Sequence, residues 1–366
     1  MRTLSNLLLA PVCILAAACS YPGTGAVDAL CRETFPSDGP GAALLIMKGD
    51  KVVYEKGFGL ADMQTKAPIT PDTFFNLASV SKQFTASAVM QLQEGGKLRV
   101  DDKVKKFFPQ YTSPVWDNIT IGNFLSHSSG LPVDQYRRTI TTVEQRLAMT
   151  DSMAVIAFDT IDSLAFEPGT GYQYENATYA LMGKLIEQVS GEPFADYMRA
   201  HVFDKAGMEE TIYFEPEKED LIPRMAHGYE LENGLWQECD YGEETCFATR
   251  PDGGLYSSVR EFAQWERALR SCSVISEQSR ETAQTPKIRA KAGESYVPGS
   301  EMSYCYGWLT GASSKGEQVI YHFGGNGGFR TAALRYPESG TFIVVLSNQS
   351  EWDRPAFLRS LEQIVL

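Results

Sequence analysis

Strand-forming segments lie near both ends of this chain, with a long and mostly helical stretch between them. Residues 41–60, GAALLIMKGDKVVYEKGFGL, predict two strands around a Gly-Asp turn. Strand patterns return near the C-terminus as CYGWLTG, EQVIYHFGG, FRTAALRYP and TFIVVLSNQ, separated by glycine-containing turns. We therefore predict an α+β fold: an antiparallel sheet of N- and C-terminal strands flanked by helices, with residues 79–285 inserted as a mostly helical second lobe.

The inserted stretch carries apolar residues at helical spacing. SKQFTASAVMQLQEGG predicts a helix that stops at Gly95-Gly96, and ATYALMGKLIEQVSGEPFADYMRAHVF predicts two helices broken at Ser190-Gly191. RPAFLRSLEQIVL predicts an amphipathic helix near the C-terminus. A cleft between the two lobes is the expected place for a site.

Composition limits the partners. The chain has 366 residues, 43% apolar and 22% charged, which is ordinary for a globular protein. Its net charge of −13 disfavours nucleic acid or an anionic membrane face as a partner. No CxxC pair, HExxH motif or clustered ligand set occurs, so we predict neither a metal nor a cofactor.

The N-terminus has the pattern of an export signal. Arg2 precedes LLLAPVCILAAA, an apolar run too short to form a stable membrane span. We predict a signal peptide over residues 1–18, a linker over 19–30 and one domain over 31–366. Two cuts fit the same letters: a lipoprotein peptidase would leave Cys19 lipidated as a membrane tether, and an ordinary signal peptidase could cut in the alanine run before it. The predicted location is the periplasm, or the outer membrane as an anchored lipoprotein.

Export places the remaining cysteines in an oxidising compartment. Cys239 and Cys246 flank the short loop DYGEET and are candidates for a disulfide, and Cys272 with Cys305 is a second candidate pair. If Cys19 is not lipidated, it could pair with Cys31. The sequence does not decide among these pairings.

Three short segments carry candidate chemistry. In ASVSKQFTA, Ser79 and Lys82 are separated by three positions, so they share one face at the start of a helix. There the serine could be a nucleophile and the lysine its base, or the pair could be a helix cap and an exposed lysine. In YQYENATYA, Tyr174 beside a cationic lysine could have a lowered pKa and relay protons, and Asn176 could hold Lys82 or a substrate carbonyl. The alternative is a core tyrosine and a capping asparagine.

The third segment is YHFGGNGGFRT. His322 and Gly324 fall at the end of a predicted strand, where glycine lets a ligand approach the backbone. A backbone N–H just after Gly324 could form an oxyanion hole with that of Ser79. The alternative is an ordinary hairpin with glycines in its turn.

Taken in order, Ser79-x-x-Lys82, Tyr174-x-Asn176 and His322-x-Gly324 resemble the serine β-lactamase and penicillin-binding protein family. The branch that they resemble is the class C β-lactamase-like group, with its DD-carboxypeptidases, esterases and D-aminopeptidases. ITIGNFLSHSSGLP and GGLYSSVREFAQW resemble the family as well, and the likeness covers roughly residues 30–366.

This resemblance implies a mechanism. Ser79 would attack a carbonyl and form an acyl-enzyme, while Lys82 and Tyr174 move the proton. The N–H groups of Ser79 and, by position, Gly325 would stabilise the oxyanion. His127, in SHSSGLP, would have a structural role.

One position departs from the pattern. Members that hydrolyse β-lactam antibiotics usually have a lysine where this chain has His322, and a mostly neutral histidine would bind a carboxylate more weakly. The chain therefore looks more like a peptidase or esterase than an efficient β-lactamase, with Arg330 as a candidate replacement charge. The alternatives are a non-catalytic envelope binding protein that keeps the fold, and an α/β-hydrolase, which the lack of a Gly-x-Ser-x-Gly motif disfavours.

Overall fold

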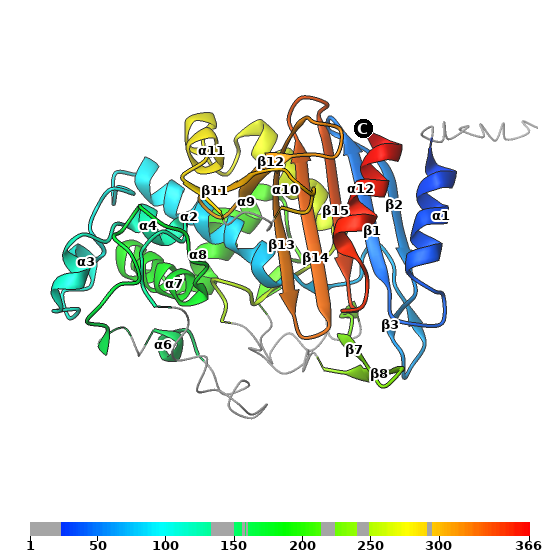
Figure 1. Cartoon of the computed structure of the whole chain (residues 1–366), viewed down its shortest axis with the longest axis horizontal. Coiled ribbons are helices and arrows are strands. Elements are labelled where there is room, and N and C mark those ends of the chain that lie inside the picture. Colours follow the sequence, from blue (N-terminus) through cyan, green and yellow to red (C-terminus); the bar gives the residue numbers. More distant parts are fainter. Residues whose placement is uncertain are drawn as a thin grey trace, which may run out of the picture.

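The computed structural model of the protein describes residues 23–132, 150–155, 158, 160–213, 224–239, 249–290 and 295–366. An antiparallel eight-stranded sheet runs through it in the order β10-β11-β12-β13-β14-β15-β1-β2 (Figure 1). β1 (Ala42–Lys48) lies between its hairpin partner β2 (Lys51–Phe58) and β15 (Thr341–Ser347), with Ala42 opposite Ser347. The predicted sheet, built from strands of both chain ends, is confirmed.

The other strands of this sheet come from the C-terminal part: β10 (Ile288–Arg289), β11 (Met302–Tyr304), β12 (Leu309–Ala312), β13 (Gln318–Asn326) and β14 (Phe329–Tyr336). CYGWLTG is not one strand, because residues 305–308 form the turn between β11 and β12. The Cys305 N–H donates to the Trp308 carbonyl over 2.8 Å, and Gly307 has a φ of 81°. A Cβ at Gly307 would lie 2.8 Å from the Lys82 carbonyl oxygen, so glycine lets this turn sit on the helix below it.

Two layers of helices cover the sheet. The run AALLIMK in β1 is buried along most of its length because both faces of the strand are covered. Leu44 and Ile46 pack in the core beneath α1 (Thr24–Thr34) and α12 (Arg354–Val365). Leu45 and Met47 pack in the opposite core, with α10 (Val259–Ser271) and the inserted helices. Figure 1 shows α1 and α12 side by side on one side of the sheet and the inserted region on the other.

The predicted linker over 19–30 is wrong for residues 24–30, which belong to α1. Val27 and Cys31 are buried there, because apolar residues four apart form one helix face that packs on β2 and α12. Asp28 fixes the helix to the strand: its carboxylate accepts from the Tyr54 hydroxyl at 2.6 Å and from the Lys56 ammonium at 2.7 Å.

Helices dominate the described part of the inserted region, and two small sheets interrupt them. The helical elements are η1 (Ala78–Ser81), α2 (Lys82–Glu94), α3 (Val104–Phe107), η2 (Pro114–Asp117), α4 (Ile121–Leu125), α6 (Asp151–Ala154), α7 (Asn176–Ser190), α8 (Phe194–Met198), η5 (Arg199–Phe203), α9 (Asp204–Ala206) and α11 (Glu277–Gln284). The break predicted at Ser190-Gly191 is confirmed: α7 ends at Ser190, and Gly191 has a φ of 83°.

Further short strands lie in this region and just before it, and their pairing was not predicted. They are β3 (Leu60–Asp62) with β4 (Ala67–Pro68), β5 (Phe75–Asn76) with β9 (Leu255–Ser257) and β6 (Ile212–Tyr213), and β7 (Tyr229–Glu232) with β8 (Leu235–Glu238). Through β9, the segment just before Ser79 pairs with a segment about 180 residues further along the chain. Among the described residues, no helix has both the length and the apolar character needed to cross a membrane.

Asn348 joins the main sheet to the loops beside it. Its side chain is fully buried, and its amide oxygen accepts from the Gly41 N–H at 2.7 Å. Its amide nitrogen donates to the carbonyls of Leu60 at 3.0 Å and His227 at 2.8 Å. One side chain thus satisfies backbone groups of three distant segments.

The predicted pairing of Cys272 with Cys305 is wrong, because both are free thiols. Cys305 is buried and its thiol donates to the Gln284 carbonyl at 3.2 Å, whereas Cys272 ends α10. Cys31 is also a free thiol, and its candidate partner Cys19 lies outside the described residues, as does Cys246.

Candidate active site

Ser79 lies in a strained turn at the start of a helix. The helix begins as the 3₁₀ turn η1 and continues as α2. Ala78, just before the serine, has a φ of 47°, which is unfavourable for a residue with a side chain. Its N–H donates to the Asn76 side chain at 2.8 Å, which holds this conformation. In a 3₁₀ turn, residues three apart lie one above the other, so Ser79 and Lys82 are brought together.

Lys82 is completely buried and surrounded by oxygen acceptors. Its ammonium donates to Ser79 Oγ at 3.1 Å, to Asn176 Oδ1 at 2.7 Å and to the Asp252 carbonyl at 2.7 Å. A buried ammonium needs such partners, because desolvation without them is costly. The interpretation as an exposed lysine on an ordinary helix is therefore wrong.

Tyr174 lies beside this pair. Its ring centroid is 5.0 Å from Lys82 Nζ, and its hydroxyl is buried beside that of Ser79. Burial raises the pKa of Tyr174 well above its ordinary value, and the Ser79 hydroxyl counters this only in part. The lowered pKa that the sequence suggested for Tyr174 is thus wrong for the protein without substrate. The phenol stays protonated and can donate its hydrogen.

His322 is buried in β13 and uncharged. Its Nδ1 lies 2.7 Å from the Phe323 carbonyl, which can only accept, so Nδ1 carries the proton. Its Nε2 then accepts from the Tyr304 hydroxyl at 2.9 Å. Burial first, and then the charge of Lys82, lower the pKa of His322 to about 3, so the neutral histidine expected from the sequence agrees with its surroundings.

Gly324 and Gly325 differ in their surroundings. A Cβ on Gly324 would lie 2.2 Å from Thr331 Oγ1 and 2.4 Å from the Leu77 carbonyl, so only glycine lets β13 pack against η1. A Cβ on Gly325 would meet nothing closer than the Arg330 guanidinium at 3.5 Å. Gly325 is exposed and borders the cavity in front of Ser79.

A cavity of about 390 Å³ opens over the serine. Its lining combines the inserted region with β13, and includes Ser79, Tyr174, His322, Gly324, Gly325, Arg330 and Arg354. Lys82 and Asn176 stand behind Ser79 rather than in the cavity wall. The structure thus brings all seven predicted site residues to one place.

Sequence reasoning missed Arg354, the first residue of α12. Its guanidinium donates to the Gly324 carbonyl at 2.7 Å and lies 4.3 Å from the Phe323 ring centroid. Burial first, and then the charge of Arg330, lower the pKa of Arg354 to about 10. No carboxylate among the described residues pairs with either arginine. Arg354 lies in no recognisable motif, so nothing in the sequence indicated that its charge lies beside Gly324 in the folded protein.

His127 is a second residue whose place the sequence did not reveal. It is fully buried with a φ of 55°, and its ring centroid lies 4.1 Å from that of Tyr174. Its Nδ1 accepts from the Glu175 N–H at 3.2 Å, so it packs behind the tyrosine as a neutral ring. In the described part of the chain, no group of three or more metal-type ligands occurs.

A half-buried serine that accepts from a buried lysine, beside a protonated phenol and an open cavity, defines a serine hydrolase of the serine–lysine kind. Comparison with known protein families agrees, because the sequence model of the family described as Beta-lactamase matches residues 33–364. The chain belongs to the β-lactamase family.

Individual relatives support this assignment. Penicillin-binding protein 4* of Bacillus subtilis (strain 168) is 30% identical over 332 residues, which are 88% of this chain and 71% of that protein. An octameric penicillin-binding protein homologue from Pyrococcus abyssi has a TM-score of 0.79 at 28% identity, over 93% of this chain and 75% of that one. A D-amino acid amidase from Ochrobactrum anthropi SV3 shares the fold, with a TM-score of 0.72 at 22% identity over 92% of this chain and 93% of that one.

The two neighbouring glycines give a matched test of the packing behind the site. Gly324→Ala should lower the free energy of unfolding by about 2 kcal/mol, because the new Cβ overlaps two atoms that cannot retreat. Gly325→Ala, whose Cβ has ordinary contacts, should change it by less than about 0.5 kcal/mol. Urea denaturation measures both values, and equal losses in the two variants would contradict the geometry.

His322 should make stability depend on pH. Its pKa is about 3 when folded, against an ordinary value of 6.5. Between these values the unfolded chain binds a proton that the folded chain does not, so stability falls as the pH falls. Through this group alone, the free energy of unfolding should be about 2 kcal/mol lower at pH 5 than at pH 8.

The variant His322→Gln cannot titrate and should lose less stability over the same range. His127, whose pKa burial also lowers, will leave part of the slope in place. Denaturation curves of both proteins at pH 5 and pH 8 measure the difference. The same loss in wild type and variant would show that His322 is not buried as a neutral ring.

Proposed function

We propose that this protein cleaves an amide or ester bond through an acyl-enzyme on Ser79. The observation that carries the proposal is the 3.1 Å contact between Ser79 Oγ and the buried Lys82 amine, at the floor of an open cavity. In its unprotonated form, Lys82 takes the serine proton as Ser79 attacks the substrate carbonyl. The oxyanion is stabilised by the N–H groups of Ser79 and Gly325, each contributing about 3 kcal/mol.

Tyr174 acts as the general acid for the leaving group. Because burial keeps its phenol protonated, it donates a proton to the departing nitrogen or oxygen. The ammonium of Lys82 then returns a proton to the phenolate, which restores both side chains. In the second half-reaction, water or another acceptor attacks the acyl-enzyme and the same groups act in reverse.

The charges around the cavity favour substrates with a carboxylate near the scissile bond. A neutral His322 supplies no charge, but Arg330 and Arg354 line the same cavity without a carboxylate partner among the described residues. These guanidinium groups take over the role of the lysine that β-lactam-hydrolysing relatives have at position 322. We infer a small-molecule or peptide substrate and only weak β-lactamase action.

Labelling with a penicillin or fluorophosphonate probe tests the nucleophile. Wild type should gain one adduct by mass spectrometry, located on Ser79, and Ser79→Ala should gain none. Hydrolysis by Ser79→Ala should fall by more than about a thousandfold, because the covalent route is lost. Labelling of Ser79→Ala to the wild-type extent would refute the mechanism.

A substrate panel tests the specificity. Nitrocefin, p-nitrophenyl esters and D-amino-acid amides would be compared in pairs with and without a carboxylate. Arg354→Gln should raise KM for the carboxylate-bearing member of each pair by about tenfold and leave the neutral member within about twofold. Equal changes for both members would remove Arg354 from substrate recognition. No turnover of any substrate, together with no labelling, would favour a non-catalytic binding protein.

We further propose that the protein is exported, as the N-terminal sequence predicts, and that the cut before Cys19, one of the two that fit this sequence, leaves it tethered through a lipidated Cys19. Growth with an alkyne-tagged fatty acid should label the wild-type protein and leave Cys19→Ala unlabelled. Equal labelling of both, or labelling of neither, rules out this anchor.

A further inference from the structure

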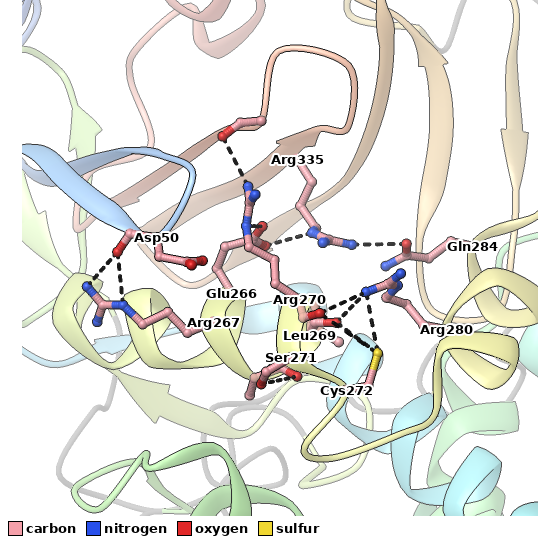
Figure 2. A network of polar contacts seen from close by, with 12 residues as sticks. Asp50, Glu266, Arg267, Leu269, Arg270, Ser271, Cys272, Arg280, Gln284 and Arg335 are labelled. Carbon is pink, nitrogen blue, oxygen red and sulfur yellow. Dashed lines mark hydrogen bonds and ion pairs between the residues drawn. The ribbon is translucent and has the colours of Figure 1, made fainter.

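A second cavity, of about 580 Å³, opens where α10 and α11 meet β13 and the end of β14. It shares no lining residue with the cavity over Ser79. We call it the arginine pocket, after three of its lining residues, Arg270, Arg280 and Arg335. Figure 2 shows these three side chains around Glu266 and Gln284.

Glu266 is completely buried and uses both carboxylate oxygens. Oε1 accepts from Arg270 Nε at 2.6 Å, and Oε2 accepts from Arg335 Nε at 2.6 Å (Figure 2). Two guanidinium groups around one buried carboxylate satisfy it and leave one positive charge in excess. These ion pairs also hold α10 to β14. A structural role therefore explains Glu266, Arg270 and Arg335, but it does not explain the open arginine pocket beside them.

Arg280 adds a third positive charge from α11. Its side chain is only 17% exposed, and it donates to the Leu269 carbonyl at 2.6 Å. Its Nη2 also pairs with the Glu277 carboxylate at 3.3 Å. The Glu277 side chain is 72% exposed, so solvent weakens this ion pair. Glu281 is the other acidic residue of the lining and is exposed at the rim.

Gln284 supplies an unsatisfied donor inside the pocket. The residue is 8% exposed, and its amide oxygen accepts from Arg335 Nη1 at 3.0 Å. Its amide nitrogen is buried and has no partner among the described residues. A buried N–H without an acceptor is unfavourable, so an acceptor in the cavity would complete the site.

We propose that the arginine pocket binds a small organic anion whose carboxylate or phosphate oxygens accept from Arg280, Arg335 and the Gln284 amide. Ile320, Pro286 and Pro337 line the same hollow and leave room for an apolar part of the ligand. The net charge of the chain is −13, so composition does not explain a pocket with three arginines and two glutamates. This site is independent of the chemistry at Ser79.

Isothermal titration of the full chain with benzoate and with phenyl phosphate tests the pocket. At least one probe should bind saturably, and the one that binds identifies the preferred oxyanion. Arg280→Gln and Gln284→Met should each weaken binding by about tenfold or more, because each removes a hydrogen bond to a charged group. Arg270 and Arg335 are left intact because they neutralise buried Glu266.

Arg267→Gln is the matched control. Arg267 lies on α10, one turn before Arg270, but donates to the Asp50 carbonyl at 3.1 Å, away from Gln284 (Figure 2). Its loss should change binding by less than about twofold. No saturation by either probe up to about 10 mM overturns the proposal, as does binding that survives Arg280→Gln and Gln284→Met or that Arg354→Gln abolishes. If Arg280→Gln does not fold, the uncharged change Gln284→Met decides alone.

Discussion

The burial of the Lys82 ammonium is the constraint on which the active site depends. A charge that is fully removed from water has to be surrounded by acceptors, and these come from three places: Ser79 one turn earlier, Asn176 at the start of α7, and the Asp252 carbonyl before β9. The hydrogen bonds that compensate for burying the Lys82 ammonium therefore also position Ser79 and Asn176. They keep Tyr174, two residues before Asn176, close to both.

The sheet supplies the other wall of the site. β13 can approach η1 only because Gly324 has no side chain, and the same strand carries His322 and Gly325 to the cavity. Arg354 reaches this edge from α12, on the opposite side of the sheet, by passing its guanidinium over Phe323 to the Gly324 carbonyl. The cavity thus receives its nucleophile from the inserted region and its charge from a C-terminal helix.

Most of the features that the sequence predicted correctly depend on residues that are close together in the chain. Ser79 and Lys82 could be paired because a single helical turn relates them, and β1 and β15 were recognisable as apolar strands. Effects that depend on distant contacts could not be predicted. Tyr174 has a raised pKa because the fold buries it, and residues 24–30 form a helix because β2 and α12 cover them. Arg354 stands in no motif. Cys272 and Cys305 are free thiols, one just after α10 and the other in the turn after β11.

The pairing of β1 with β15 has a consequence for how the protein is made. Ala42 meets Ser347, so one edge of the first hairpin has no partner until β15, about 300 residues further along the chain, has been synthesised. Contacts of such long sequence separation form slowly, and an unpaired apolar strand edge invites association with other chains. Synthesis from the N-terminus therefore cannot complete the central sheet strand by strand, because β1 keeps one unpaired edge until β15 is available.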